Sequence, residues 1–201
     1  MRLLLLLSLS LAAWAQSLTV TAPWLVVYDA EGRPRWEIRL EKLWRTKEGW
    51  EGEGVSVTLF WAGEPSFKVQ AQAIRAEALG RSWTLSGEIA GEGYGFSFTA
   101  EEASWDGRLR LKHFQAQGHG LSLVAQEARW ELEGPLELFA AEGEGMGWSL
   151  RFPYGRFAEG VLVAQEPEAV GHGLRLRAEL LELWVDEGRL KFRRVQVVRG
   201  S

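Results

Sequence analysis

The sequence predicts an all-β protein, a single creased antiparallel β-jellyroll or open sandwich of about a dozen strands. A ten-residue phrase with apolar or small residues at positions 1, 3, 5, 8 and 10 occurs five times, starting at Phe67, Phe96, Leu121, Trp148 and Leu174. Gly-x-Gly directly precedes four of the copies. Alternation at period two is typical of half-buried strands, and recurrence every 25 to 30 residues is typical of stacked hairpin units.

The chain opens with a predicted signal peptide over residues 1–15. Arg2 is a short basic region, residues 3–12 are almost wholly apolar, and Ala13-Trp14-Ala15 has the small-x-small pattern of a cleavage site. The apolar run is shorter than a membrane-spanning helix requires. We therefore expect an exported, periplasmic protein with one domain over residues 16–201. An uncleaved inner-membrane anchor is the alternative.

The first section of this domain contains three predicted strands. Residues 24–28 form the first strand, 29–34 a turn and 35–44 a longer strand. A second turn at 49–54 precedes a strand at 55–61. A looser copy of the phrase starts at Trp36, so this section belongs to the same array.

The step from position 5 to position 8 of each phrase predicts a crease. A step of three inverts the alternation, so a flat strand would direct its second half to the opposite face. A bulge at the two intervening residues, such as Gln72-Ala73, Glu101-Glu102 or Gln126-Glu127, would keep all apolar residues on one face. Because the step recurs in each copy, the bends stack and the sheet folds into two facing walls.

A second set of glycines marks the middle of each unit, at 80, 107, 134, 160 and 188. A shorter apolar stretch follows each of them, at 83–85, 109–111, 136–138, 161–163 and 190–192. Glycine tolerates the positive φ that tight hairpin turns require. Each unit is therefore two antiparallel strands, and the whole chain is a meander.

Composition and motifs argue against several functional classes. The 201 residues carry 23 basic and 27 acidic side chains, interspersed along the chain, which argues against a nucleic-acid partner. His119 and His172 occupy the middle of Gly-x-Gly turns, so we interpret them as turn surface and expect no metal. Glu101 and Glu102 are interpreted as solvated, and no nucleophile elbow is present. We expect no enzyme activity and no cofactor.

The inward phrase positions predict an apolar trough between the walls. Its lining is Trp36, Ile38, Leu40, Phe67, Val69, Phe96, Phe98, Leu121, Leu123, Trp148, Leu150, Leu174 and Leu176. An open trough would accept lipid chains, whereas a filled one would be an ordinary core. Two further hypotheses are an outer-membrane β-barrel, which the outward Arg and Glu residues disfavour, and a structural or adhesive repeat protein.

Residues 28–38 and 55–60 resemble the opening of the periplasmic lipopolysaccharide-export component LptC. Residues 96–100 with 105–107 resemble the repeats of its relative LptA, the OstA-like family. The resemblance covers about residues 20–197. It implies a jellyroll open along one side that carries acyl chains of lipopolysaccharide or another envelope glycolipid. It also implies edge-to-edge joining with other β-jellyroll export components. Proteins of the LptC type keep an N-terminal membrane helix. This sequence differs from them, because its residues 1–15 have the pattern of a cleavable signal peptide.

Overall fold

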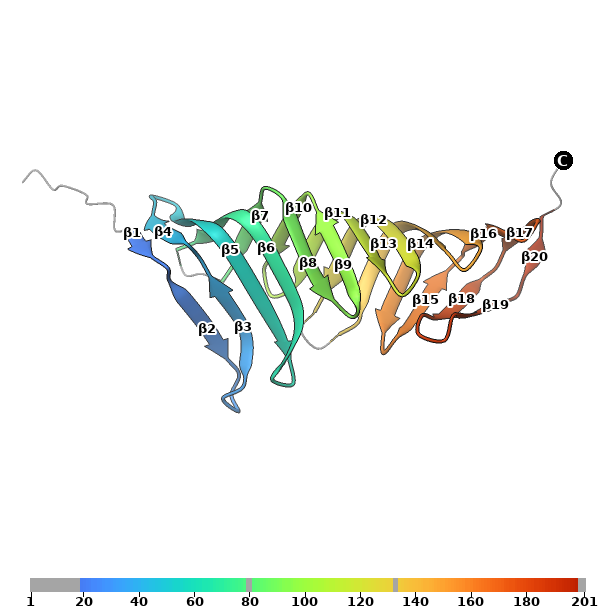
Figure 1. Cartoon of the computed structure of the whole chain (residues 1–201), viewed down its shortest axis with the longest axis horizontal. Coiled ribbons are helices and arrows are strands. Elements are labelled where there is room, and N and C mark those ends of the chain that lie inside the picture. The colour runs from blue at the N-terminus through green and yellow to red at the C-terminus, as the bar shows by residue number, and fades with distance from the viewer. Residues whose placement is uncertain (1–18, 79–80, 132–133, 199–201) are drawn as a thin grey trace, which may run out of the picture.

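The computed structural model describes residues 19–78, 81–131 and 134–198. These residues form twenty β-strands and no helix, and each strand pairs antiparallel with its neighbours (Figure 1). Within these ranges, no helix is present that could cross a membrane. The predicted all-β class is confirmed. The predicted leader lies outside the described residues, as do Gly80 and Glu133 of two predicted turns.

The strands form a meander of thirteen rungs, in which each rung pairs with the rung before it and the rung after it. Six rungs are unbroken strands: β5 (Gly49–Trp61), β6 (Glu64–Glu77), β11 (Leu109–Gly118), β12 (Leu121–Trp130), β13 (Leu136–Gly145) and β14 (Trp148–Ala158). Seven rungs are divided: β1 (Thr19–Thr21) with β2 (Trp24–Tyr28), β3 (Pro34–Arg39) with β4 (Lys42–Arg45), β7 (Trp83–Ser86) with β8 (Ile89–Gly93), β9 (Phe96–Ala100) with β10 (Glu102–Trp105), β15 (Val161–Gln165) with β16 (Glu168–Gly171), β17 (Leu174–Arg177) with β18 (Leu180–Trp184), and β19 (Arg189–Arg193) with β20 (Gln196–Val197). The dozen strands expected from the sequence correspond to these rungs.

A crease crosses the rungs at the predicted step, but in the unbroken strands it uses one residue per strand instead of two. Between β11 and β12, Lys112 lies opposite Glu127 and Phe114 lies opposite Ala125. His113 is therefore the only residue of β11 skipped by the pairing, and it is matched by one skipped residue in β12. Both strands bend at the same place, so neither needs an extra residue and the register continues unchanged.

The crease divides the sheet into two walls. Wall A consists of β2, β3, β8, β9, β16, β17 and β20 with one half of each unbroken strand. Wall B consists of β1, β4, β7, β10, β15, β18 and β19 with the other halves.

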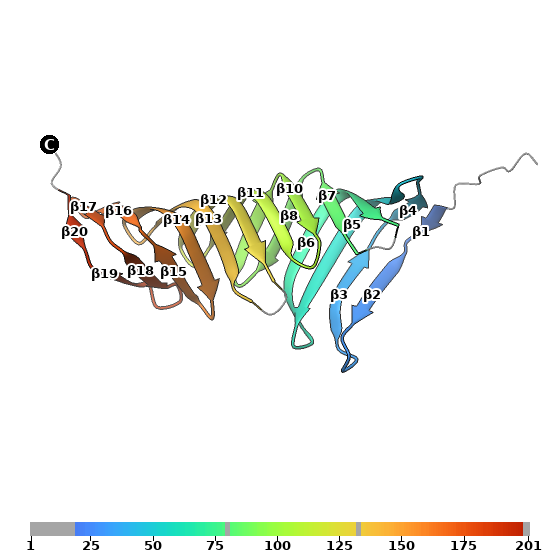
Figure 2. The same cartoon turned by 180° about the vertical axis from the view of Figure 1, so that it is seen from behind.

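The molecule is elongated, and its strands run across the long axis (Figures 1 and 2). At the N-terminal end β2 and β3 lie below β1 and β4, whereas at the C-terminal end β18 and β19 lie below β17 and β20 (Figure 1). The pair of walls thus turns about the long axis, as the twist of β-sheets requires.

The hairpin turns lie at the free edges of the walls, away from the crease. Those of wall A, which we call lip A, include the four Gly-x-Gly turns. Their middle residues have φ of 48–54° and the glycine that follows has φ of 72–78°. Two successive positive φ angles define the type I′ turn, which matches the twist of the strands it joins. The turns of wall B form lip B.

Candidate functional site

The predicted trough residues lie in the space between the walls. Ten of the thirteen are buried: Ile38, Leu40, Phe67, Val69, Phe96, Phe98, Leu121, Leu123, Leu150 and Leu176. Trp36 and Trp148 are partly buried and pack against this set. Leu174 is 47% exposed. The sequence pattern therefore identified residues that share one space.

This interior is apolar throughout the described residues, which include no buried polar or charged residue. The Nε1 of Trp83 is the one buried side-chain polar atom of the described chain without a hydrogen-bond partner. Trp83 is 3% exposed, and its ring stacks on that of Trp105 at 6.0 Å. An unpaired buried N–H is costly, so this group would gain from an oxygen acceptor on a ligand.

Aromatic side chains from the two walls meet in the middle of the molecule. Phe67 of wall A stacks on Trp130 of wall B, with ring centroids 5.3 Å apart. Phe96 of wall A meets Phe157 of wall B edge to face at 5.5 Å. Such pairs stabilise beyond the area they bury. The walls are therefore in direct contact here, and the interior is filled.

The two lips also meet in this section. Trp130 Nε1 donates to the hydroxyl oxygen of Tyr94, which lies in lip A, at 2.7 Å. His119, also in lip A, places Nδ1 2.9 Å from a carboxylate oxygen of Asp186 in lip B. Its Nε2 lies 3.2 Å from the backbone carbonyl oxygen of Tyr94. Tyr94, His119 and Asp186 therefore close the opening between the walls.

Both ends of the interior are exposed. At the N-terminal end, Leu25 and Val27 lie opposite Ile38 and Trp36 in the sheet, yet they are 47% and 37% exposed. At the C-terminal end, Val197 lies opposite Leu176 and is 62% exposed. These side chains face the interior, but no further rung covers them within the described residues. The apolar interior thus opens along the long axis.

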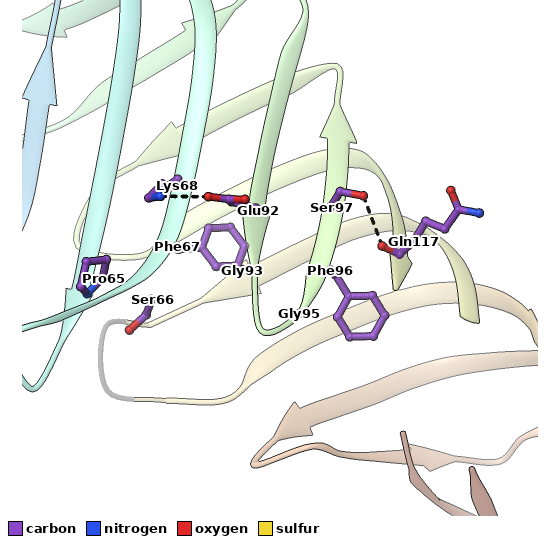
Figure 3. A pocket seen from close by; sticks show the side chains of 10 residues that line it. All are labelled: Pro65, Ser66, Phe67, Lys68, Glu92, Gly93, Gly95, Phe96, Ser97 and Gln117. Atoms are coloured by element: carbon purple, nitrogen blue, oxygen red, sulfur yellow. Dashed lines mark hydrogen bonds and ion pairs between the residues drawn. The ribbon is translucent and has the colours of Figure 1, made fainter. Parts of the chain in front are cut away.

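An open concavity of about 540 Å³ lies over β6, β8, β9 and β11. Lys68 Nζ and Glu92 pair across its surface at 3.0 Å, and Ser97 Oγ donates to the backbone carbonyl oxygen of Gln117 at 3.3 Å (Figure 3). Each of these polar groups has a partner, and none forms a nucleophile–base pair. The polar side chains of the concavity therefore stabilise the sheet by bonding to neighbouring strands.

The titratable groups with shifted pKa values lie mainly outside the interior. A hydrogen bond from Arg129 lowers the pKa of Glu127. Burial raises the pKa of Tyr94, and burial followed by a hydrogen bond to Glu137 raises the pKa of Tyr154. In the described part of the chain, no three His, Asp or Glu side chains come close enough to hold a metal ion.

Sequence reasoning missed the residues that join the lips. His119 is interpreted as turn surface above, and Tyr94 occupies the same middle position of the Gly-x-Gly motif in another unit. The structure shows Tyr94 packed against the core and His119 bridging to the other wall. A large aromatic residue at a two-residue turn was the available signal, since such turns otherwise favour Asn, Asp or Gly.

Comparisons with known proteins show similarity to solved structures. No family model and no curated protein matches the sequence. Among solved structures, the chain is similar to LptH of Pseudomonas aeruginosa, described as the LptA-homologous periplasmic component of the conserved lipopolysaccharide transport device. The match covers 67% of this chain and 95% of that chain, with 9% identity and a TM-score of 0.29. Similarity at this level is too low to assign a fold or a function.

Proposed function

We propose that this protein is a non-enzymatic, periplasmic component of lipid export across the cell envelope. It holds acyl chains of lipopolysaccharide or another envelope glycolipid between its walls, and it joins other β-jellyroll components edge to edge. The observation that carries the proposal is an apolar interior that opens at both ends of a meander whose terminal strands have free edges.

The interior has the chemistry that acyl chains require. Its buried side chains are aliphatic or aromatic, and the charged residues of the walls point outward. Transfer of apolar surface out of water is the main driving force for binding a lipid chain. The resemblance of residues 28–38 and 55–60 to LptC supports lipopolysaccharide as the first cargo to test.

The terminal strands support edge-to-edge joining. In the described residues, β1 and β2 pair only with β4 and β3, and β19 and β20 pair only with β18 and β17. Free N–H and C=O groups along such an edge are a template for an added strand. A rung added at the N-terminal edge would also cover Leu25 and Val27, and one added at the C-terminal edge would cover Val197. Either rung would extend the apolar interior into the partner.

A second candidate function is a structural or adhesive module with a solid core. The contacts of Phe67 with Trp130 and of Phe96 with Phe157 favour it, because they fill the middle of the interior. Under the first proposal, acyl chains bind along the whole interior, and its middle admits them when the lips separate.

Lipid binding by the mature protein distinguishes the two functions. Mass spectrometry should find a glycolipid that reproducibly co-purifies, and a fluorescent glycolipid should be taken up. Phe98→Glu and Leu123→Glu place a charge among buried side chains and should abolish uptake. Thr99→Glu and Ser122→Glu are matched controls at neighbouring exposed positions and should leave uptake unchanged.

Circular dichroism shows whether each variant keeps its fold. A folded wild-type protein that carries no lipid and takes up none would exclude lipid carriage and favour the solid-core module.

A further inference from the structure

The C-terminal edge strand β19 has a basic outward face. Arg189, Lys191 and Arg193 alternate along it, with side chains 58%, 58% and 53% exposed. The residues between them, Leu190 and Phe192, pack against the core. Residues 189–193 contain no carboxylate. The cations therefore form one row on the outer side of wall B.

Elsewhere on the outer face, several cations pair with a carboxylate of the neighbouring rung, although Arg110 lies opposite Arg129. Examples are Lys68 with Glu92 at 3.0 Å, Arg75 with Glu51 at 3.1 Å, Arg151 with Glu142 at 2.7 Å and Arg177 with Glu168 at 2.8 Å. Opposite charges on adjacent strands stabilise the pairing, whereas like charges directly opposite each other destabilise it. These pairs show that cations on the outer face can be matched by carboxylates on the adjacent strand.

The row on β19 is not fully balanced by the rung beside it. Glu182 of β18 lies opposite Lys191 and is the partner of both Lys191, at 3.8 Å, and Arg193, at 2.5 Å. Arg189 pairs with Glu187 in the adjoining turn at 3.1 Å. One carboxylate of the neighbouring strand therefore serves two cations, and the described residues place no strand on the other side.

A second copy of this chain is a poor match for the edge. If the walls continue from one copy to the next, β19 meets β1 and β20 meets β2. Thr19–Thr21 of β1 has no carboxylate to offer the cations. Charge therefore disfavours self-assembly at this edge.

From these observations we infer that β19 pairs with the edge strand of a different protein, one that presents carboxylates at alternate outward positions. The inference rests on the edge-to-edge joining of the proposed function and specifies the partner. Main-chain hydrogen bonds hold the added strand, and the three cations select it by charge.

Binding of synthetic strand peptides to the mature protein tests this inference. The probe is a blocked peptide that alternates Glu and Val, and its controls replace Glu with Gln or Lys. We expect the Glu peptide to bind about tenfold more tightly than the Gln peptide, with affinity that falls as salt rises. Amide chemical shifts should change in residues 189–193.

The variant for this test reverses the charges on β19 and on Glu182 together, so that the ion pairs between β18 and β19 are kept. Glu182→Lys with Lys191→Glu and Arg193→Glu should switch the preference to the Lys peptide. The same exchange within the sheet, Glu142→Lys with Arg151→Glu, should leave the preference for the Glu peptide unchanged.

The inference would be overturned if no peptide binds, or if all three peptides bind equally. It would also be overturned if the amide chemical shifts change in β1 and β2 and not in residues 189–193. The fourth contrary result is that sedimentation detects oligomers of this protein alone, and that the charge reversal on β19 dissociates them. Lipid uptake is measured separately, so lipid carriage and partner choice can fail independently of each other.

Discussion

Tyr94 shows how one side chain connects the two walls. Its backbone, at φ 54°, belongs to a hairpin turn of lip A, and its ring lies 5.8 Å from Phe157 of wall B. Its hydroxyl accepts the Nε1 hydrogen of Trp130, which is 1% exposed. The turn therefore has a packing role in addition to reversing the chain.

Tyr94→Phe should destabilise the protein through Trp130. The substitution removes the acceptor and leaves a buried N–H unpaired, which costs about 1–3 kcal/mol. Tyr154→Phe is the control, because its hydroxyl bonds to Glu137 on the outer face and its loss should change stability by less than about 1 kcal/mol. Urea denaturation measures both, and equal effects would contradict a special role for Tyr94.

The same contact should depend on pH. Burial raises the pKa of Tyr94 above its ordinary value, so the folded state favours the neutral phenol. Its contribution is complete below pH about 10, the pKa expected of an unfolded tyrosine, and is lost as pH rises through the higher folded value. Because the pKa of Tyr154 is also raised, the relevant quantity is the difference between wild type and Tyr94→Phe. That difference should shrink at alkaline pH.

Asp29 organises the β2–β3 turn at the N-terminal end. Its Oδ1 accepts from the backbone N–H of Arg33 at 2.8 Å and of Glu31 at 3.0 Å, and Arg33 Nε donates to Oδ2 at 2.8 Å. The backbone hydrogen bond from Arg33 is the main cause of a lowered pKa of Asp29. The stabilising charge is therefore present above pH about 4 and is lost as pH falls through the lowered value.

NMR titration of the Asp29 carboxyl carbon should show a midpoint below 3.8, its ordinary value. Arg33→Met should raise the midpoint only in part, because the backbone donors remain. A midpoint at the ordinary value would show that the turn is open in solution.

At the scale of the strand, the crease uses the backbone differently on alternate rungs. Residues with positive φ stand at the bend of every second rung: Ala22, Gly54, Glu88, His113, Ala140, Glu166 and Arg194. The sequence predicted the bend, because apolar residues are visibly spaced by three there. It did not predict the left-handed residues, since only one of the seven is a glycine and the neighbouring strand dictates the conformation.

Ala140 of β13 and Gln126 of β12 test this alternation. Each stands at the bend of its strand, and each is the residue that the pairing between these two strands skips. Both are exposed, but only Ala140 has a positive φ, at 48°. Ala140→Val should cost about 1–2 kcal/mol, since a β-branched residue is strained in the left-handed region. Gln126→Val should be neutral within about 0.5 kcal/mol. Equal costs in thermal unfolding would show that both bends have the same backbone.

At the scale of the molecule, the interior is filled in the middle and exposed at the ends. Alternation in the sequence predicted the inward faces of Phe67, Phe96 and the other phrase residues. It could not predict that rings of opposite walls touch. That depends on how sharply the sheet folds at the crease and on how the twist brings distant rungs together. Neither quantity is encoded in any single phrase.

The closed lips lead to a prediction about lipid entry. Asp186 is 69% exposed, and its ion pair with His119 joins the lips, so Asp186→Ala removes one link between the walls. An exposed pair contributes little to stability, and the fold should persist. If acyl chains enter by separation of the lips, the variant should take up fluorescent glycolipid faster than wild type.

Glu101→Ala is the matched control, because Glu101 pairs with His113 at 2.8 Å beside the crease, far from the lips in each rung. The control should have the wild-type rate. A rate that is equal in all three proteins would indicate that lipid enters through the open ends of the interior and that the lips stay closed.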